Sequence, residues 1–205
     1  MKALKYILVG ILAVFLGFKS IYLMPLDQKL AENQIIDFDA ETFVEGIWNT
    51  ELMKVYNNAP DIDLLIDSLK QHPKSTFAKN GNSLGIGNIG YFRVKGQGEV
   101  LQINENNVLL QTANNTVEIE TEFIFGNAIR DASGLIKIND FDDTSDFNSI
   151  SEMINDRIRK ELIPSFSSEL KIHQTVRFEG AVELNREHLT LSQLEVIPFT
   201  LKIIP

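Results

Sequence analysis

The sequence contains no cysteine. Disulfides, thiolate nucleophiles, cysteine-ligated zinc and a lipid-modified cysteine are therefore excluded for these residues. A chain without cysteine folds equally well in an oxidising or a reducing compartment, so this absence does not indicate a location.

Basic residues are also scarce. The chain has 19 Lys and Arg against 28 Asp and Glu, a formal net charge of -9. Because Lys2, Lys5 and Lys19 belong to the N-terminal segment, the rest carries 16 basic and 28 acidic residues, net -12. Binding to phosphates draws most of its free energy from Lys and Arg. A nucleic-acid partner is therefore not expected.

Catalytic signatures are missing as well. The three histidines, His72, His173 and His188, are far apart and have no H-x-x-x-H or H-x-H spacing. The sequence has no G-x-S-x-G nucleophile motif and no G-K-[ST] phosphate loop. We therefore expect no catalytic residue, no metal ligand and no cofactor.

Two stretches imitate ligand-binding motifs. Residues Gly85 to Gly90 spell G-x-G-x-x-G, but a predicted helix precedes them and a predicted strand follows, the reverse of the order in a dinucleotide fold. The acidic run Asn139 to Asp146 resembles the start of a calcium loop, but Ser145 stands where glycine is needed and Ser151 where glutamate is needed. We interpret both as solvated loops.

The N-terminus carries the one long apolar run. Tyr6 to Phe18 is apolar, and the run resumes at Ile21 to Met24 after Lys19 and Ser20. A spanning helix needs about 20 residues, a length reached if Lys19 extends its amine to the interface. A cleaved secretory signal is the alternative, although no A-x-A-like cleavage site follows the run.

We therefore predict an uncleaved signal-anchor over residues 1–25. Lys2 and Lys5 precede the span, which places the N-terminus in the cytoplasm by the positive-inside rule. The chain is then a single-pass protein of the cytoplasmic membrane, with its body, residues 26–205, outside as a single domain.

The first part of the body predicts a helical hairpin over about 39–73. Asp39 is a plausible N-cap for a helix with one apolar face that includes Val44, Trp48 and Leu52. Asp61 can cap a second short helix that ends near residue 73.

The second part, about 90–205, predicts five strands and a helix. Strands are expected at 91–103, 107–112, 116–125, 175–184 and 189–204, with a bend at Gly96 and Gly98 in the first. A helix is expected between the third and fourth strands, capped by Ser149 and Glu152 and stopped by Pro164. Three strands, a helix and two strands is the order of an OB-like barrel. The predicted fold class is α+β: a five-stranded antiparallel OB-like barrel with an N-terminal helical hairpin and an anchor helix.

Charged residues interrupt apolar surroundings in AIRDAS and IND. Arg130, Asp131, Asn139 and Asp140 are therefore candidates either for a structural pairing or for a ligand pocket. A pairing of Arg130 with Asp131 is the first hypothesis. An enzyme that uses Asp131 and Asp140 as a carboxylate pair is an alternative, which requires both carboxylates in one pocket without a basic partner.

Several blocks resemble the DUF2291 family in order and spacing. They are FDAETFVEGIWNTELM, FRVKGQGEV, FGNAIRDASGLIKINDF, FNSISEMIND, TVRFEGAVEL and LEVIPFTL. The family is described as predicted periplasmic lipoproteins of unknown function. The resemblance implies an OB-like barrel outside the inner membrane of a bacterium, with a membrane or transport protein as a candidate partner. The chain departs from the family in having no lipobox cysteine and in reading FDDTSD after its NDF block.

The function predicted from these observations is a membrane-tethered, extracytoplasmic, non-catalytic binding or accessory module of unknown ligand. The alternatives are an enzyme with an unrecognised carboxylate site and an OB-fold nucleic-acid binder, the second disfavoured by the acidic charge.

Overall fold

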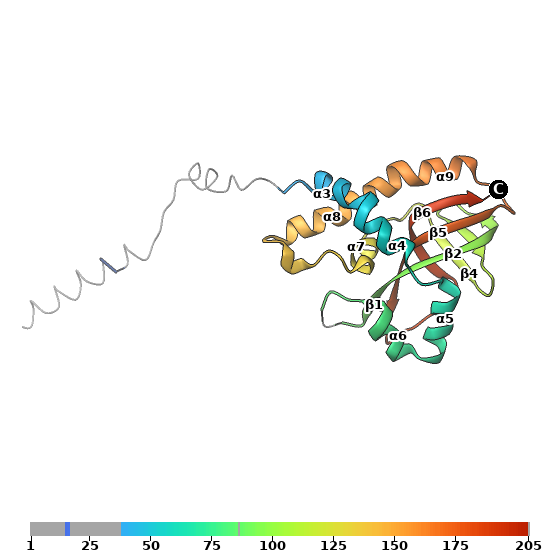
Figure 1. The fold of residues 1–205 in the computed structure, drawn as a ribbon, viewed down its shortest axis with the longest axis horizontal. Coiled ribbons are helices and arrows are strands. Elements are labelled where there is room, and N and C mark those ends of the chain that lie inside the picture. Colours follow the sequence, from blue (N-terminus) through green and yellow to red (C-terminus); the bar gives the residue numbers. More distant parts are fainter. Residues whose placement is uncertain (1–14, 17–37, 86, 205) are drawn as a thin grey trace, which may run out of the picture. The chain divides into compact units, whose positions relative to one another are not determined.

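The computed structural model describes residues 15–16, 38–85 and 87–204. Apart from residues 15–16, the predicted anchor lies outside these ranges. Within them, no helix is both long enough and apolar enough to cross a bilayer. The chain divides into two units, 1–38 and 39–205, and the second contains the folded body (Figure 1).

A closed five-stranded barrel forms the centre of the body. Its strands are β2 (Ile89–Ile103), β3 (Asn107–Gln111), β4 (Thr116–Glu120), β5 (Thr175–Asn185) and β6 (Leu194–Ile204). Their spatial order is β2-β3-β4-β6-β5, and β5 pairs with β2 to close the barrel. A short strand, β1 (Gly81–Asn82), adds to the beginning of β2. The prediction of an OB-like barrel is therefore confirmed.

The expectation of a wholly antiparallel barrel is wrong at one seam. β4 and β6 run parallel, with Val117 opposite Leu194 and Ile119 opposite Val196, whereas the other barrel pairs are antiparallel. The predicted third strand is also too long, because β4 ends at Glu120. There the Glu120 carboxylate accepts hydrogen bonds from three successive backbone N–H groups, those of residues 121–123. A turn begins there, although the Thr121 N–H also donates to the carbonyl oxygen of Asn106 at 2.9 Å.

Glycine in the long first strand allows close packing against the next strand. The register of β2 shifts between Val100 and Gln102, beyond the predicted bend at Gly96 and Gly98. A Cβ at Gly98 would lie 2.7 Å from the carbonyl oxygen of Gln111 on β3. Only glycine allows β2 and β3 to approach this closely.

The N-terminal helices serve two different cores. The first comprises α3 (Ala40–Ile47), the π-helical segment η1 (Trp48–Leu52) and α4 (Met53–Asn57), and it begins at the predicted N-cap: the Asp39 carboxylate accepts from the N–H of Glu41 at 3.0 Å. The second is α5 (Ile62–Gln71), capped as predicted by Asp61. An unpredicted helix, α6 (Pro73–Asn80), follows because Pro73 starts a new helix in its first turn.

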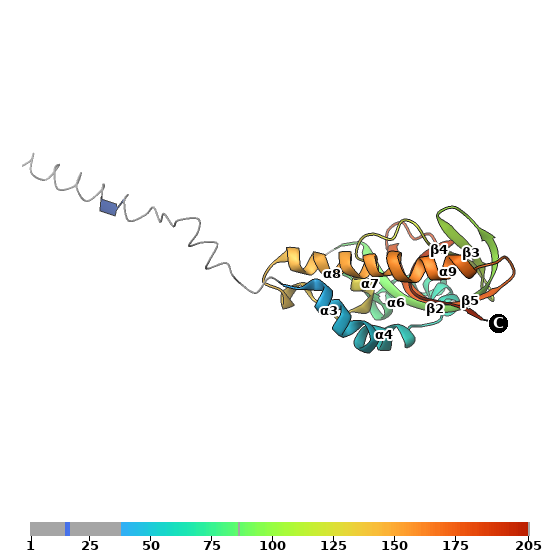
Figure 2. The ribbon, with the colours of Figure 1, turned by 90° about the horizontal axis from the view of Figure 1, so that it is seen from above.

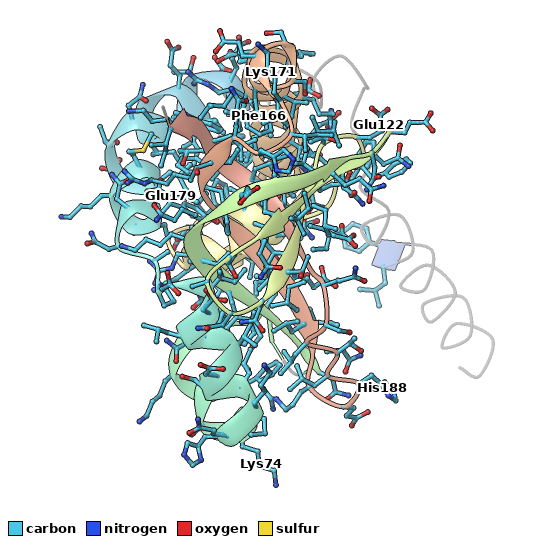
Figure 3. The ribbon with its side chains drawn as sticks, turned by 90° about the vertical axis from the view of Figure 1, so that its right-hand side faces the viewer. Lys74, Glu122, Phe166, Lys171, Glu179 and His188 are labelled. Carbon is cyan, nitrogen blue, oxygen red and sulfur yellow. The ribbon has the colours of Figure 1, made fainter. Side chains whose placement is uncertain are left out.

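The barrel interior is closed at both ends by helices. Ile62, Leu65 and Phe77 of α5 and α6 join the barrel core at one end, and Phe166 joins it from α9 (Ile163–Glu169). Figure 3 shows Lys74 of α6 at one end of the body and Phe166 at the other. The predicted hairpin is thus divided, because only its second helix enters this core.

A second core lies between the outside of the barrel and a helical layer. Phe199 of β6 packs against Trp48 and Tyr56, with ring centroids 4.7 and 4.5 Å apart. Ala181 of β5, which alternates with inward-facing residues, is also fully buried. Phe147, Ile150 and Ile154 contribute the apolar face of α8 (Thr144–Arg157).

The helix between the third and fourth barrel strands is longer than predicted. It begins at Asp143, whose carboxylate accepts from the N–H of Ser145 at 2.8 Å, so the expected capping box at Ser149 is wrong. It runs through α8, the π-helical segment η3 (Ile158–Leu162) and α9 as one long helix (Figure 2). Pro164 does not stop it: the proline comes directly after the π-helical segment, where the regular hydrogen-bond ladder is already interrupted, and the helix continues to Glu169.

Candidate functional site

The buried helix α7 (Ala128–Ser133) carries two of the residues predicted from sequence. Arg130 and Asp131 form an ion pair, with 2.8 Å between Nε and Oδ1. The Arg130 Nη1 group also donates to the carbonyl oxygen of Phe147 at 2.8 Å, and the guanidinium stacks 3.5 Å from the centroid of that ring. These contacts join α7 to the start of α8 and give Nε and Nη1 hydrogen-bond partners, in a residue that is only 1% exposed.

The electrostatics of the pair are those of a buried structural contact. Burial raises the pKa of Asp131, and the hydrogen bond and charge of Arg130 oppose that rise. Arg130 Nη2 and Asp131 Oδ2 have no hydrogen-bond partner among the described residues. Breaking a buried ion pair of this kind destabilises the fold, because removing one partner leaves the other charge buried and unpaired.

The backbone of α7 connects the pair to the surrounding elements. The Tyr56 hydroxyl donates to the carbonyl oxygen of Ile129 at 2.7 Å, and the Asn82 amide donates to that of Ala132 at 2.8 Å. On β2, burial and the neighbouring Glu183 raise the pKa of Tyr91 to about 12. A phenol with that pKa remains protonated at neutral pH and is a poor general base.

The other two predicted residues lie elsewhere. Asn139 and Asp140 are exposed in the 3-10 turn η2 (Ile138–Asp140), where the Asp140 carboxylate accepts from the N–H of Lys137 at 3.3 Å. Asp131 is buried and paired with Arg130, whereas Asp140 caps a surface turn. The two carboxylates therefore do not share the unneutralised pocket that the enzyme alternative requires.

The face that OB-folds commonly use for nucleic acids is acidic here. That face lies over the second and third barrel strands, β3 and β4. Glu118 and Glu120 of β4 lie near Glu195 of β6, whose pKa is raised by burial and by these neighbouring carboxylates. Single-strand binders need a positive groove, so this face does not suit a polyanion.

A groove follows the long helix, with three hollows along it. Its first hollow, about 360 Å³, lies between Glu41 and Glu45 of α3 and Arg157, Lys160 and Glu161 of the long helix. The second, about 340 Å³, is shared by Trp48, Arg157, Glu161 and Phe199. The third, about 260 Å³, lies between α9 and the end of β6, at Ser165, Leu201 and Ile203.

Sequence reasoning did not identify this groove. The signal in the sequence was the i, i+4 spacing of Glu41 with Glu45 and of Arg157 with Glu161, which places each pair on one polar helix face. Which two faces lie opposite one another depends on how α3 packs beside α8, and no local pattern encodes that packing.

Two stretches of the sequence imitate metal and nucleotide motifs. No group of three or more Asp, Glu or His side chains in the described ranges is placed to hold a metal ion. Gly85 and Gly87 lie between β1 and β2, and Gly90 is already in β2, so the motif leads into a strand and not into a helix N-terminus that could face a pyrophosphate.

Comparison with known proteins agrees with the fold. A solved OB-fold protein from Thermotoga maritima is 26% identical, with a TM-score of 0.73, over 82% of this chain and 99% of that chain. No match was found among curated proteins. Residues 11–202 match the DUF2291 family, described as a predicted periplasmic lipoprotein. The matched region covers nearly the whole chain, and the protein therefore belongs to the DUF2291 family.

Proposed function

We propose that this protein is a non-catalytic binding or accessory module, tethered to the cytoplasmic membrane with its body outside the cytoplasm. The groove along the long helix is the observation that carries the proposal. It offers a concave, partly aromatic surface, while the buried Arg130 and Asp131 pair serves the packing of α7. Binding without chemistry requires no more than such a surface.

The tether is inferred from the sequence and the family together. The family is described as a predicted periplasmic lipoprotein, but this chain has no cysteine to carry a lipid. The apolar run from Tyr6 to Met24, preceded by Lys2 and Lys5, supplies an alternative attachment. A membrane or transport protein is the expected partner, because a tethered body meets other proteins at the membrane surface.

Topology can be tested directly. A reporter that is active only outside the cytoplasm should be active when fused after Pro205, and the protein should stay with membranes after carbonate washing. Full-size protein in the soluble fraction, or a mature N-terminus beyond Ser20, would contradict the anchor.

Binding can be tested in living cells with a photo-crosslinking amino acid. We expect a defined crosslinked product when it replaces Ser165, which borders two hollows of the groove. Ser168 is a matched control, since it is exposed on the same helix and lies outside those hollows. The same product from both positions, or none from either, would count against a binding role for the groove.

A further inference from the structure

The three hollows are neighbours along one helix. The first and second share Arg157 and Glu161, and the second and third share Leu162, Ser165 and Leu201. On the helix they extend from Met153 to Glu169, which corresponds to about 24 Å at 1.5 Å per residue. A strand-like peptide rises about 3.3 Å per residue, so about seven extended residues would fill this length. A compact small molecule would occupy only one hollow.

The charges of the groove are unevenly neutralised. The cations of its long-helix wall are already paired: Arg157 Nε lies 3.2 Å from Glu161 and Lys160 Nζ lies 2.7 Å from Asp156. Glu41 and Glu45 on the opposite wall are exposed and take part in no salt bridge among the described residues. The end of the groove at α3 therefore presents two carboxylates that a basic partner could pair with.

The middle and far parts of the groove differ from this acidic end. In the second hollow Leu162 and Leu201 form part of the wall beside Trp48 and Phe199, which are themselves buried, and the Arg157 guanidinium lies 4.7 Å above the Trp48 ring. In the third, Leu201 and Ile203 of β6 face Phe166 of α9. An occupant thus meets mainly carboxylates at the α3 end and a larger share of apolar side chains along the rest, where Arg157, Glu161, Glu169 and Lys202 also line the hollows.

We propose that the groove binds an extended polypeptide segment of a partner protein, with basic side chains at the α3 end and apolar side chains along η3 and α9. This inference rests on the proposed binding function and specifies its ligand class. Basic side chains of the segment pair with Glu41 and Glu45. Its apolar side chains fill the hollows beside Trp48 and Leu201.

The test uses the full-length protein in uncharged detergent micelles and fluorescence anisotropy. The probes are seven-residue peptides with two lysines at one end and two leucines in the remainder, made in both chain directions and labelled at the apolar end. In matched probes glutamate replaces lysine, or serine replaces leucine. We expect a lysine probe to bind at least about tenfold more tightly than either matched probe, with the charge preference weakening as salt is added.

Two variants locate the binding. Glu41→Lys together with Glu45→Lys should reverse the preference in favour of the glutamate probe, whereas Glu152→Lys with Glu187→Lys, exposed carboxylates outside the groove, should not. Ser165→Trp fills the second and third hollows and should weaken binding at least about tenfold, whereas Ser168→Trp should leave it unchanged.

Binding that ignores the charge reversal, or that survives Ser165→Trp, would overturn the inference. So would a failure of every probe to bind. Self-association that Ser165→Trp abolishes, without peptide binding, would identify a second copy of the chain as the occupant and would also overturn it. A specific crosslink from Ser165 in cells combined with a failure of the probes would refute the peptide class alone and leave the binding function standing.

Discussion

Replacing Trp48 with alanine should destabilise the body by about 3 kcal/mol. The side chain is 8% exposed, its ring lies 4.7 Å from that of Phe199, and the Arg157 guanidinium lies 4.7 Å above it. Removing a large buried aromatic costs about 3 to 5 kcal/mol. The lower end applies because Trp48 also borders the second hollow, where water can enter the space that the ring leaves.

Far-UV circular dichroism of full-length protein during heating provides the measurement, since Trp48 is the only tryptophan and fluorescence would be lost with it. For a domain of this size 1 kcal/mol corresponds to about 2–4 °C, so the midpoint should fall by about 6–12 °C. Trp48→Phe should recover part of the loss. Leu64→Ala, at a side chain 66% exposed on α5, is the control. A shift for Trp48→Ala within about 0.5 kcal/mol would refute the docking of η1 on β6.

Three further outcomes are expected. Arg130→Met should lower the free energy of unfolding, measured by urea denaturation, by about 3–5 kcal/mol, because it leaves the buried Asp131 charge unpaired. Adding Asp131→Leu should recover most of this loss. A double variant no more stable than the single variant would contradict the reasoning. Gly180→Ala should lower the stability of the body by about 1–3 kcal/mol, since the new Cβ would lie 2.3 Å from a backbone oxygen. Gly46→Ala, at a helix position with open space around it, should raise the stability by about 0.5–1 kcal/mol. A labelled mixed-sequence single-stranded DNA or RNA should show no binding at physiological salt, with any Kd weaker than about 10⁻⁴ M; a saturable, salt-sensitive micromolar signal would show that a local basic surface outweighs the net charge.

Local signals in the sequence predicted most elements correctly. Asp39 and Asp61 act as N-caps because a short carboxylate can reach the free N–H groups of the first turn in any protein context. The five strands were visible from alternation and β-branched content, and their order with one intervening helix was sufficient to predict the barrel. The same signals misplaced the start of α8. Ser149 and Glu152 match a capping box, but Asp143 begins the helix, and local pattern alone does not rank competing caps.

Candidate residues were predicted with less success than the fold. Arg130 and Asp131 stand out in the sequence as charges among apolar residues, and the structure pairs them with each other and with the carbonyl oxygen of Phe147, 17 residues from Arg130. Asn139 and Asp140 stand out in the same way but lie exposed on a surface turn. Composition cannot separate the two cases, because burial of a charge depends on which elements pack over it.

The sequence by itself determined the residue types available for chemistry, the acidic charge, the long apolar run at the N-terminus, and the barrel with its family, because these follow from composition and from periodicity along the chain. Tertiary structure alone decided the parallel seam between β4 and β6, the division of the first helices between two cores, and the groove between α3 and the long helix. Each of these depends on contacts between residues far apart in sequence. Such contacts are selected by the packing of whole faces against one another, which no local pattern specifies.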